Sequence, residues 1–277
     1  MSGAKVWLNG SLVDRANAVV SVFDHGLTVG DGIFETLRTY GGRPFAVRRH
    51  LARLTSSAAR MGLSGLPPAD ALRAALDELV AANGLRDAVL RVTVTSGPGP
   101  AGSARPPGPP TVVISSSPLP AWPDAVDVAV VPWPRNDRGA LSGHKTTSYG
   151  ENVVALAYAH ERGAAEALFA NLTGDLCEGT GSNIAVVAGG RLVTPPLHAG
   201  CLAGVTRALV IEACGVIEDD IPLAALARAP EAFLTSTTRE VQPIRAVDGH
   251  LLPSAAGPLT ATAAATLRTI IATTPDP

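Results

Sequence analysis

Hydrophobic side chains in the first part of the chain recur with two different spacings. Residues 32–40 alternate bulky side chains with smaller or polar ones, which is typical of a strand, and Gly41-Gly42 predicts the turn that follows. The next apolar residues are three or four positions apart and predict a helix; they are Val47, Leu51, Leu54, Ala58 and Met61. A second helix is expected over residues 70–83, where Gly84 would end it.

Turn signals and short apolar runs predict the remaining elements. Asn9-Gly10, between Val6-Trp7-Leu8 and Leu12-Val13, is a strong hairpin signal. Further strands are expected over residues 89–95, 111–115, 126–131, 166–171, 184–188, 191–193 and 232–236, and further helices over residues 151–162, 206–214 and 259–272. Two α+β layers joined by a linker are the simplest arrangement of these elements.

A proline-rich stretch near the middle of the chain divides the elements into two groups. We therefore expect an N-terminal domain over residues 1–117, a linker over 118–124 and a C-terminal domain over 125–277. A stretch rich in glycine and proline over residues 97–110 is too long for a simple turn. It is either a functional loop or a mobile surface loop, and Arg105 is the charged side chain within it.

Composition indicates a soluble globular enzyme. Of 277 residues, 46% are hydrophobic and 17% are charged, so the chain can bury a large core. A net charge of -2 and an aromatic content of 4% disfavour a nucleic-acid surface. Three cysteines without paired spacing are expected as free thiols in a reducing compartment. With no apolar leader and no apolar run of membrane length, we expect a cytoplasmic protein without a membrane partner.

Several short motifs carry side chains suited to chemistry. Lys145 lies in residues 143–149, Glu178 precedes a run of small and hydroxyl residues, and Arg53 lies in residues 50–54. Two hydroxyl-bearing runs follow, at residues 204–206 and 235–238. Among them are the groups needed to hold pyridoxal phosphate: an amine for its aldehyde, a carboxylate for its ring nitrogen, and two loops for its phosphate.

Other kinds of site are not indicated by the sequence. The six histidines are scattered without metal-ligand spacing, so we expect no metal site. Neither a nucleophile elbow nor a GxxxxGK[ST] phosphate loop is present, and Gly30-x-Gly32 lacks the spacing of a dinucleotide-binding motif.

The motifs, taken in order, resemble the class IV (fold-type IV) pyridoxal-phosphate enzymes. This family includes D-amino acid and branched-chain aminotransferases and aminodeoxychorismate lyases, and the similarity extends from Gly30–Glu35 to Ile244–Gly249. The resemblance implies a two-domain α+β / α/β fold, with an N-terminal α/β sandwich and a C-terminal pseudo-barrel. It also implies that the cofactor lies at the domain interface, that the larger C-terminal domain carries Lys145, and that the protein is a homodimer.

The resemblance further implies a role for each matching residue. Lys145 would form the Schiff base and, once released, would move the substrate proton. Glu178 would keep the pyridine nitrogen protonated, and Arg53 would grip the phosphate with a bidentate fork. The other expected cofactor contacts are Asn183 near the carboxylate or the phosphate loop, Leu202 on the ring face, Val205 and Thr206 at a helix start, and Ser236 and Thr237 in the second hydroxyl run. Tyr149 would either hydrogen-bond the cofactor phenolic oxygen or simply pack.

Substrate choice depends on fewer residues. Gly30–Glu35 resembles the D-amino acid aminotransferase and lyase members more than the branched-chain members. Leu27 stands where D-amino acid enzymes of this family carry a tyrosine that helps hold the substrate carboxylate. A replacement clamp is therefore expected from Arg105 or from backbone amides at Thr237-Thr238.

These observations predict a transaminase that moves an amino group between a D-amino acid and a 2-oxo acid. The acceptor would be 2-oxoglutarate or pyruvate, and (R)-amines would be further donors. The alternatives are a lyase that converts 4-amino-4-deoxychorismate to 4-aminobenzoate and pyruvate, and then a branched-chain L-amino acid aminotransferase. A non-catalytic pyridoxal-phosphate-binding or scaffold protein is disfavoured because Lys145 and Glu178 are both present.

Overall fold

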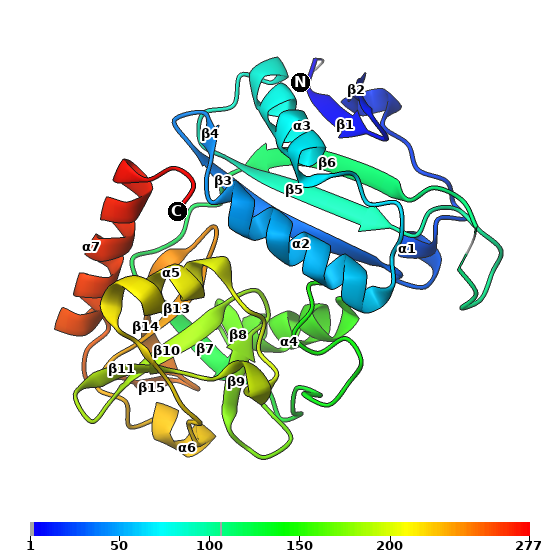
Figure 1. Cartoon of the computed structure of the whole chain (residues 1–277). Helices are drawn as coiled ribbons and strands as arrows, with labels where there is room; N and C mark the ends of the chain where they lie inside the picture. Colours follow the sequence, from blue (N-terminus) through cyan, green and yellow to red (C-terminus); the bar gives the residue numbers. More distant parts are fainter. Residues whose placement is uncertain (1–2, 106) are drawn as a thin grey trace. The chain divides into compact units, whose positions relative to one another are not determined.

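The computed structural model describes residues 3–105 and 107–277 (Figure 1). Residue 106, which belongs to the predicted glycine- and proline-rich loop, lies outside the described residues. Backbone contacts divide the chain into two compact units. The first consists of the chain up to Pro120 with His144–Tyr149 and Thr273–Pro277, and the second of Ala121–Gly143 and Gly150–Ala272. The break after Pro120 falls within the stretch predicted as a linker.

The first unit contains a six-stranded antiparallel sheet. Its order is β2-β1-β6-β5-β3-β4, with β1 (Lys5–Leu8), β2 (Ser11–Asp14), β3 (Gly32–Tyr40), β4 (Arg43–Pro44), β5 (Ala88–Thr95) and β6 (Thr111–Pro118). The predicted hairpin between β1 and β2 is confirmed, because Asn9 and Gly10 both have positive φ, at 46° and 102°.

Two helices cover one face of this sheet, as Figure 1 shows. They are α2 (Val47–Met61) and α3 (Ala69–Ala82), and both were predicted to within a residue or two. Their apolar faces pack against Leu37 of β3 and Leu90 of β5, which are fully buried. α2 ends at Gly62, whose φ of 65° closes the helix in the left-handed conformation. The short elements are η1 (Arg15–Asn17) and α1 (His25–Thr28).

Residues 144–149 pair with the first half of β3. The Phe34 N–H donates to the Lys145 carbonyl at 3.0 Å, and the Thr147 N–H donates to the Gly32 carbonyl at 2.8 Å. On the edge of β3 that faces this segment, β4 pairs only with Thr39 and Tyr40. Residues 144–149 therefore provide hydrogen-bond partners for backbone groups in the first half of β3 that would otherwise lack them. The structure thus differs from the expectation that the C-terminal domain carries Lys145, because the lysine segment packs as part of the first unit.

The second unit contains a nine-stranded mixed sheet. Its order is β12-β11-β10-β13-β14-β7-β8-β9, with β15 paired to β14. The strands are β7 (Val126–Val130), β8 (Glu166–Ala170), β9 (Leu176–Gly179), β10 (Asn183–Ala188), β11 (Arg191–Thr194), β12 (Ile217–Glu218), β13 (Ala232–Ser236), β14 (Glu240–Val247) and β15 (His250–Leu251). The terminal strand β9 also contacts β10, so the sheet curls on itself as expected for a pseudo-barrel.

The helices of the second unit are α4 (Gly150–His160), α5 (Val205–Cys214), α6 (Leu223–Leu226) and α7 (Pro258–Thr273), with the short η2 (Leu197–Ala199). The predictions for the three longer helices are confirmed to within two residues at each end. Strands β9, β12, β14 and β15 were not predicted. No helix within residues 3–105 and 107–277 has the length and apolar character needed to cross a membrane.

Candidate functional site

Lys145 lies against two aromatic rings of the first unit. Its Nζ is 4.4 Å from the ring centroid of Phe34 and 5.7 Å from that of Tyr149. The two rings meet edge to face, with centroids 5.2 Å apart. Phe34 is buried on β3, and the backbone of Lys145 is hydrogen-bonded to the same residue. The side chain of Lys145 is half-buried, and its amine lies next to this strand.

A buried charge network lies on β3 and α2. Glu35 of β3 is fully buried, and its two carboxylate oxygens accept from Nε and Nη2 of Arg53, each at 2.7 Å. Nδ1 of His50 lies 2.7 Å from the same carboxylate. His50 and Arg53 are three residues apart, which places both on one face of α2. Arg53, the expected phosphate ligand, is therefore oriented by Glu35.

The pKa values of Glu35 and His50 indicate which atoms of this network carry a proton. Burial alone would raise the pKa of Glu35, but the charge and hydrogen bonds of Arg53, with those of His50, lower it to about 2. Burial lowers the pKa of His50, and this outweighs the opposing effect of Glu35. At neutral pH His50 is therefore neutral, and Nδ1 carries the proton because an ionised carboxylate only accepts hydrogen bonds. Sequence reasoning missed the roles of Glu35 and His50, although a carboxylate in an apolar strand was the available signal.

Glu178 of β9 has both carboxylate oxygens near specific partners in the second unit. Oε2 accepts the backbone N–H of Leu202 at 2.9 Å, and Oε1 lies 3.7 Å from Nε of Arg135. The Leu202 carbonyl accepts Nδ2 of Asn183 at 2.8 Å. Three predicted residues, Glu178, Asn183 and Leu202, are thus brought together. Asn183 positions the backbone of Leu202, which in turn contacts the carboxylate.

The start of α5 is a second part of this arrangement. Gly204 precedes the helix with extended backbone, and no side chain caps the helix start. The first-turn N–H groups of a helix have no partner further back in that helix, so they are available to an anion. Val205 and Thr206, both expected cofactor contacts, occupy this turn.

The other hydroxyl-bearing run follows β13. Ser236 ends the strand, and its Oγ accepts the backbone N–H of Arg239 at 3.2 Å. Thr237 and Thr238 form the turn into β14 and are half-buried. The hydroxyl of the preceding residue, Thr235, is buried and has no hydrogen-bond partner among the residues that the structure describes.

The two expected substrate residues of the first unit lie on its surface. Leu27, on α1, is 68% exposed. Arg105 donates from Nε and Nη2 to the carboxylate of Asp31, each at 2.8 Å, and from Nη1 to the carbonyl of Met61. The hydrogen bond from Arg105 is the main reason why the pKa of Asp31 lies below its usual range. Arg105 thereby anchors the glycine- and proline-rich loop to the residue that precedes β3.

Residues 32–247, most of the chain, match the family model described as amino-transferase class IV. The chain belongs to the class IV aminotransferases. The expected fold is confirmed for this aminotransferase by the match to solved fold-type IV structures with one curled and one antiparallel sheet.

Named relatives of this class IV aminotransferase differ in substrate. It is 36% identical to a putative branched-chain-amino-acid aminotransferase of Methanocaldococcus jannaschii, over 90% of this chain and 89% of the relative. It is 33% identical to a D-alanine aminotransferase of Bacillus licheniformis, over 92% and 93%. A branched-chain aminotransferase of Thermoproteus uzoniensis, solved with norvaline, superposes with a TM-score of 0.90 at 35% identity, over 96% of this chain and 94% of that one.

Class IV aminotransferases use pyridoxal 5′-phosphate, and the side chains present suit that cofactor. The first unit provides an amine, Lys145, and a half-buried guanidinium, Arg53. The second provides the Glu178 carboxylate, the uncapped start of α5, and the hydroxyls that follow β13. By chemical type, the amine suits an aldehyde, the carboxylate a ring nitrogen, and the guanidinium and hydroxyls a phosphate.

Gly204 is the position where an added methyl group would disturb this arrangement most directly. A Cβ there would lie 1.9 Å from Oδ1 of Asn183. We expect Gly204→Ala to displace Asn183, to lower the free energy of unfolding by about 1–3 kcal/mol, and to weaken cofactor binding. Chemical denaturation of the apoenzyme and cofactor titration would measure both effects. Gly150→Ala is the matched control, since no atom lies within 4 Å of its added Cβ; equal behaviour of the two variants would contradict the prediction.

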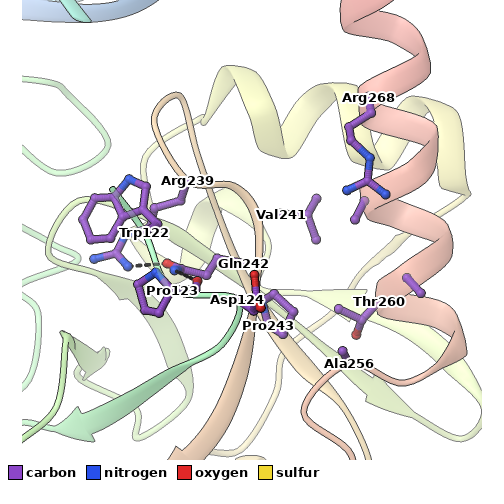
Figure 2. A pocket seen from close by; sticks show the side chains of 12 residues that line it. Trp122, Pro123, Asp124, Arg239, Val241, Gln242, Pro243, Ala256, Thr260 and Arg268 are labelled. Atoms are coloured by element: carbon purple, nitrogen blue, oxygen red, sulfur yellow. Dashed lines mark hydrogen bonds between the residues drawn. The ribbon is translucent and has the colours of Figure 1, made fainter. Parts of the chain in front are cut away.

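A pocket of about 350 Å³ also lies in the second unit, between the stretch after Pro120, β14 and α7 (Figure 2). The guanidinium of Arg239 stacks 3.7 Å from the ring centroid of Trp122 and donates to the Gln242 side chain. None of the residues expected to bind cofactor or substrate lines this pocket. Arg239 connects this pocket to the candidate site, because its backbone N–H donates to the Ser236 hydroxyl.

Proposed function

We propose that this class IV aminotransferase moves an amino group between a D-amino acid and a 2-oxo acid such as 2-oxoglutarate or pyruvate, with (R)-amines as further donors. The observation that carries the catalytic part is the placement of the Lys145 amine beside Phe34 and Tyr149, on a segment anchored to β3. The D-amino acid preference is supported by the Gly30–Glu35 motif at the start of that strand and by the D-alanine aminotransferase among the relatives.

The roles of the side chains follow from the chemistry of the cofactor. Pyridoxal 5′-phosphate supplies an aldehyde that bonds to amines and a protonated ring that withdraws electrons from the substrate Cα. Lys145 would hold the aldehyde and, once released, would move the proton of the substrate Cα. Glu178 holds a proton on the ring nitrogen.

The remaining contacts orient the cofactor and substrate. The groups that would bind the phosphate are Arg53, the start of α5, Ser236 and Thr237. Leu202 would lie against one ring face, and the Tyr149 hydroxyl would donate to the phenolic oxygen. For the substrate carboxylate we favour the backbone amides at Thr237-Thr238, because each guanidinium nitrogen of Arg105 already donates to Asp31 or Met61.

The half-reaction with single amino donors tests the proposed function. The purified holoenzyme is mixed with one donor, and absorption of the bound aldehyde form is followed as it converts to the amine form. We expect D-alanine and D-glutamate to bleach this absorption. Bleaching only by L-leucine or L-valine would overturn the D-amino acid proposal. Release of pyruvate from 4-amino-4-deoxychorismate, without a half-reaction with any amino acid, would identify the lyase instead.

A branched-chain L-amino acid aminotransferase is the second candidate. The observation that favours it is the identity to relatives named for that activity, which is similar to the identity to the D-alanine enzyme. The same half-reaction separates the two candidates, because the donors differ in the configuration at Cα.

We also propose that the protein is a homodimer. The segment that contains α1 exposes a run of large apolar side chains in the first unit, and such a run is typical of an interface; its members are Val19, Val20, Val22, Phe23, Leu27 and Val29. Val22 and Phe23 are 70% and 66% exposed. In a dimer this segment would be covered by the second copy, and Leu27 would lie at the covered surface.

Introducing charge into this segment is expected to dissociate the dimer. Val22→Asp combined with Phe23→Asp should shift the mass measured by light scattering after size exclusion from two chains to one. Burying two carboxylates without partners in an apolar interface is costly, which is the reason for the expected shift. Leu251→Asp, at an exposed position on β15, is the control. A wild-type protein with the mass of one chain would rule out the homodimer.

A further inference from the structure

Arg135 occupies a constrained position beside the carboxylate assigned to the cofactor ring nitrogen. It follows β7, and its side chain is only 13% exposed. Its guanidinium carbon lies 3.9 Å from the ring centroid of Phe169 on β8. Nη1 donates to Asn152 at 2.7 Å and to Glu151 at 2.5 Å. The stacking and these hydrogen bonds hold the guanidinium in one orientation.

The remaining edge of the guanidinium faces Glu178. Nε of Arg135 is 3.7 Å from Oε1 of Glu178, within ion-pair distance but beyond a hydrogen bond. This Nε is buried and has no hydrogen-bond partner in the described part of the chain. The other oxygen of Glu178 accepts the Leu202 N–H, so the carboxylate lies between a backbone donor and a cation. A buried guanidinium nitrogen left without a hydrogen bond costs free energy, and the proximity to Glu178 offsets part of that cost.

Two thiols and two further acids lie near Glu178 and Arg135. Burial raises the pKa of the Cys177 thiol well above its usual range and that of the Cys201 thiol to about 12, so both stay neutral. Glu151, which pairs with Nη1 of Arg135 at 2.5 Å, is an acid that is 43% exposed. Asp137, which acts on the Cys177 thiol, is also an acid. These groups are neutral or acidic, whereas Arg135 places a cation 3.7 Å from the Glu178 carboxylate.

We propose that Arg135 is a positioning residue that keeps Glu178 ionised and directs its carboxylate toward the cofactor ring nitrogen. The proposal rests on the role of Glu178 in the proposed function. A cation beside a carboxylate stabilises the ionised form, so a proton shared between Glu178 and the ring nitrogen stays on the nitrogen. The ring then keeps the positive charge that draws electrons from the substrate. Arg135 itself does not contact the reacting atoms in this role.

Arg135→Gln tests the proposal in the holoenzyme. Glutamine can still hydrogen-bond Asn152 but carries no charge. We expect kcat to fall by roughly 10- to 100-fold, as is typical when a group that orients a cofactor ligand is removed. We also expect the acid limb of the profile of cofactor affinity against pH to move upward by about one pH unit or more. Arg135→Lys keeps the positive charge but lacks the planar guanidinium, and it should show most of the wild-type pH profile.

Two further variants make the result specific. In a Glu178→Gln background, Arg135→Gln should change neither the pH profile nor kcat further, because the group it acts on is gone. Arg162→Gln is the matched control: Arg162 also stacks on a ring, 3.4 Å from the centroid of Tyr158, and it forms an ion pair with Glu161. Melting temperatures of all variants identify any loss of folding.

The outcomes distinguish a failure of the Arg135 proposal from a failure of the proposed function. An Arg135→Gln enzyme with the wild-type pH profile, or with the same loss of kcat in the Glu178→Gln background, would overturn the role of Arg135. Wild-type activity in Glu178→Gln alone would instead remove Glu178 from the proposed function. If Arg135→Gln is too unstable to purify, the Arg135→Lys profile decides: a wild-type acid limb supports the role of charge, and a shifted one contradicts it.

Discussion

Lys145→Ala is expected to abolish covalent attachment of the cofactor and to remove nearly all transaminase activity. The amine carries two functions, holding the aldehyde and moving the proton between the substrate and the cofactor. Loss of the proton transfer alone corresponds to a fall in kcat of roughly 10²- to 10⁴-fold. Borohydride reduction followed by mass spectrometry of the peptide that contains residue 145 measures the attachment directly, independently of activity.

The Lys145 prediction has a matched control in Lys5→Ala. Lys5 lies on β1 and pairs with Asp14 at the surface, so its removal should leave both attachment and activity unchanged. Methylamine added to the Lys145→Ala protein should restore part of the activity, because a small free amine can replace the missing base. A reducible cofactor adduct that persists in Lys145→Ala would contradict the assignment of this lysine.

Glu35→Gln is expected to lower the free energy of unfolding by about 3–5 kcal/mol. Removing one partner of a buried ion pair leaves the other charge without compensation, and Glu35 is fully buried between Arg53 and His50. The variant should also bind the cofactor more weakly, since Arg53 loses the carboxylate that orients it. Chemical denaturation of the apoenzyme at neutral pH measures the first effect, and cofactor titration measures the second.

The pH dependence of this difference identifies its electrostatic origin. The pKa of Glu35 is about 2 in the folded protein, below its ordinary value of 4.5. Its contribution is therefore fully present above about pH 4.5 and is lost as the pH falls toward 2. His50 acts in the same direction from near pH 6.5, because burial lowers its pKa in the folded state.

The difference in free energy of unfolding between wild type and Glu35→Gln should thus shrink below pH 4.5. Glu161→Gln is the control, because Glu161 is 77% exposed and its ion pair with Arg162 is long, at 3.8 Å. A Glu35→Gln protein within 1 kcal/mol of wild type at neutral pH would show that the ion pair is not a main source of stability.

The local elements of the fold follow from short-range patterns in the sequence. Helix α2 has a clear helical period of apolar residues and ends at Gly62, and the β1–β2 hairpin has Asn9-Gly10. β14 shows where this reasoning fails. Pro243 interrupts its pattern and cannot donate to a neighbouring strand, yet β14 lies between β13 and β7 in the sheet. Its place depends on partners distant in the sequence, which local propensity does not report.

Part of the candidate site was likewise recognisable from the sequence, and part of it was not. The motifs around Lys145, Glu178 and Arg53 were recognisable because the cofactor requires those residue types, and the class IV family was expected from them. The pairing of Arg53 with Glu35 was not expected, since the two residues are 18 positions apart and on different elements. Arg135 and Glu178 are further apart still, and no pattern in the sequence relates them.

By itself, the sequence determined the family, the cofactor chemistry and the position of most helices and strands, because these depend on residue type and on periods of a few residues. Only the tertiary structure decided that the Lys145 segment completes the edge of β3, that Glu35 orients Arg53, and that Arg135 faces Glu178. The physical reason is that backbone pairing and buried charges are satisfied by whichever groups the folded chain brings within hydrogen-bond or ion-pair distance, regardless of their separation in sequence.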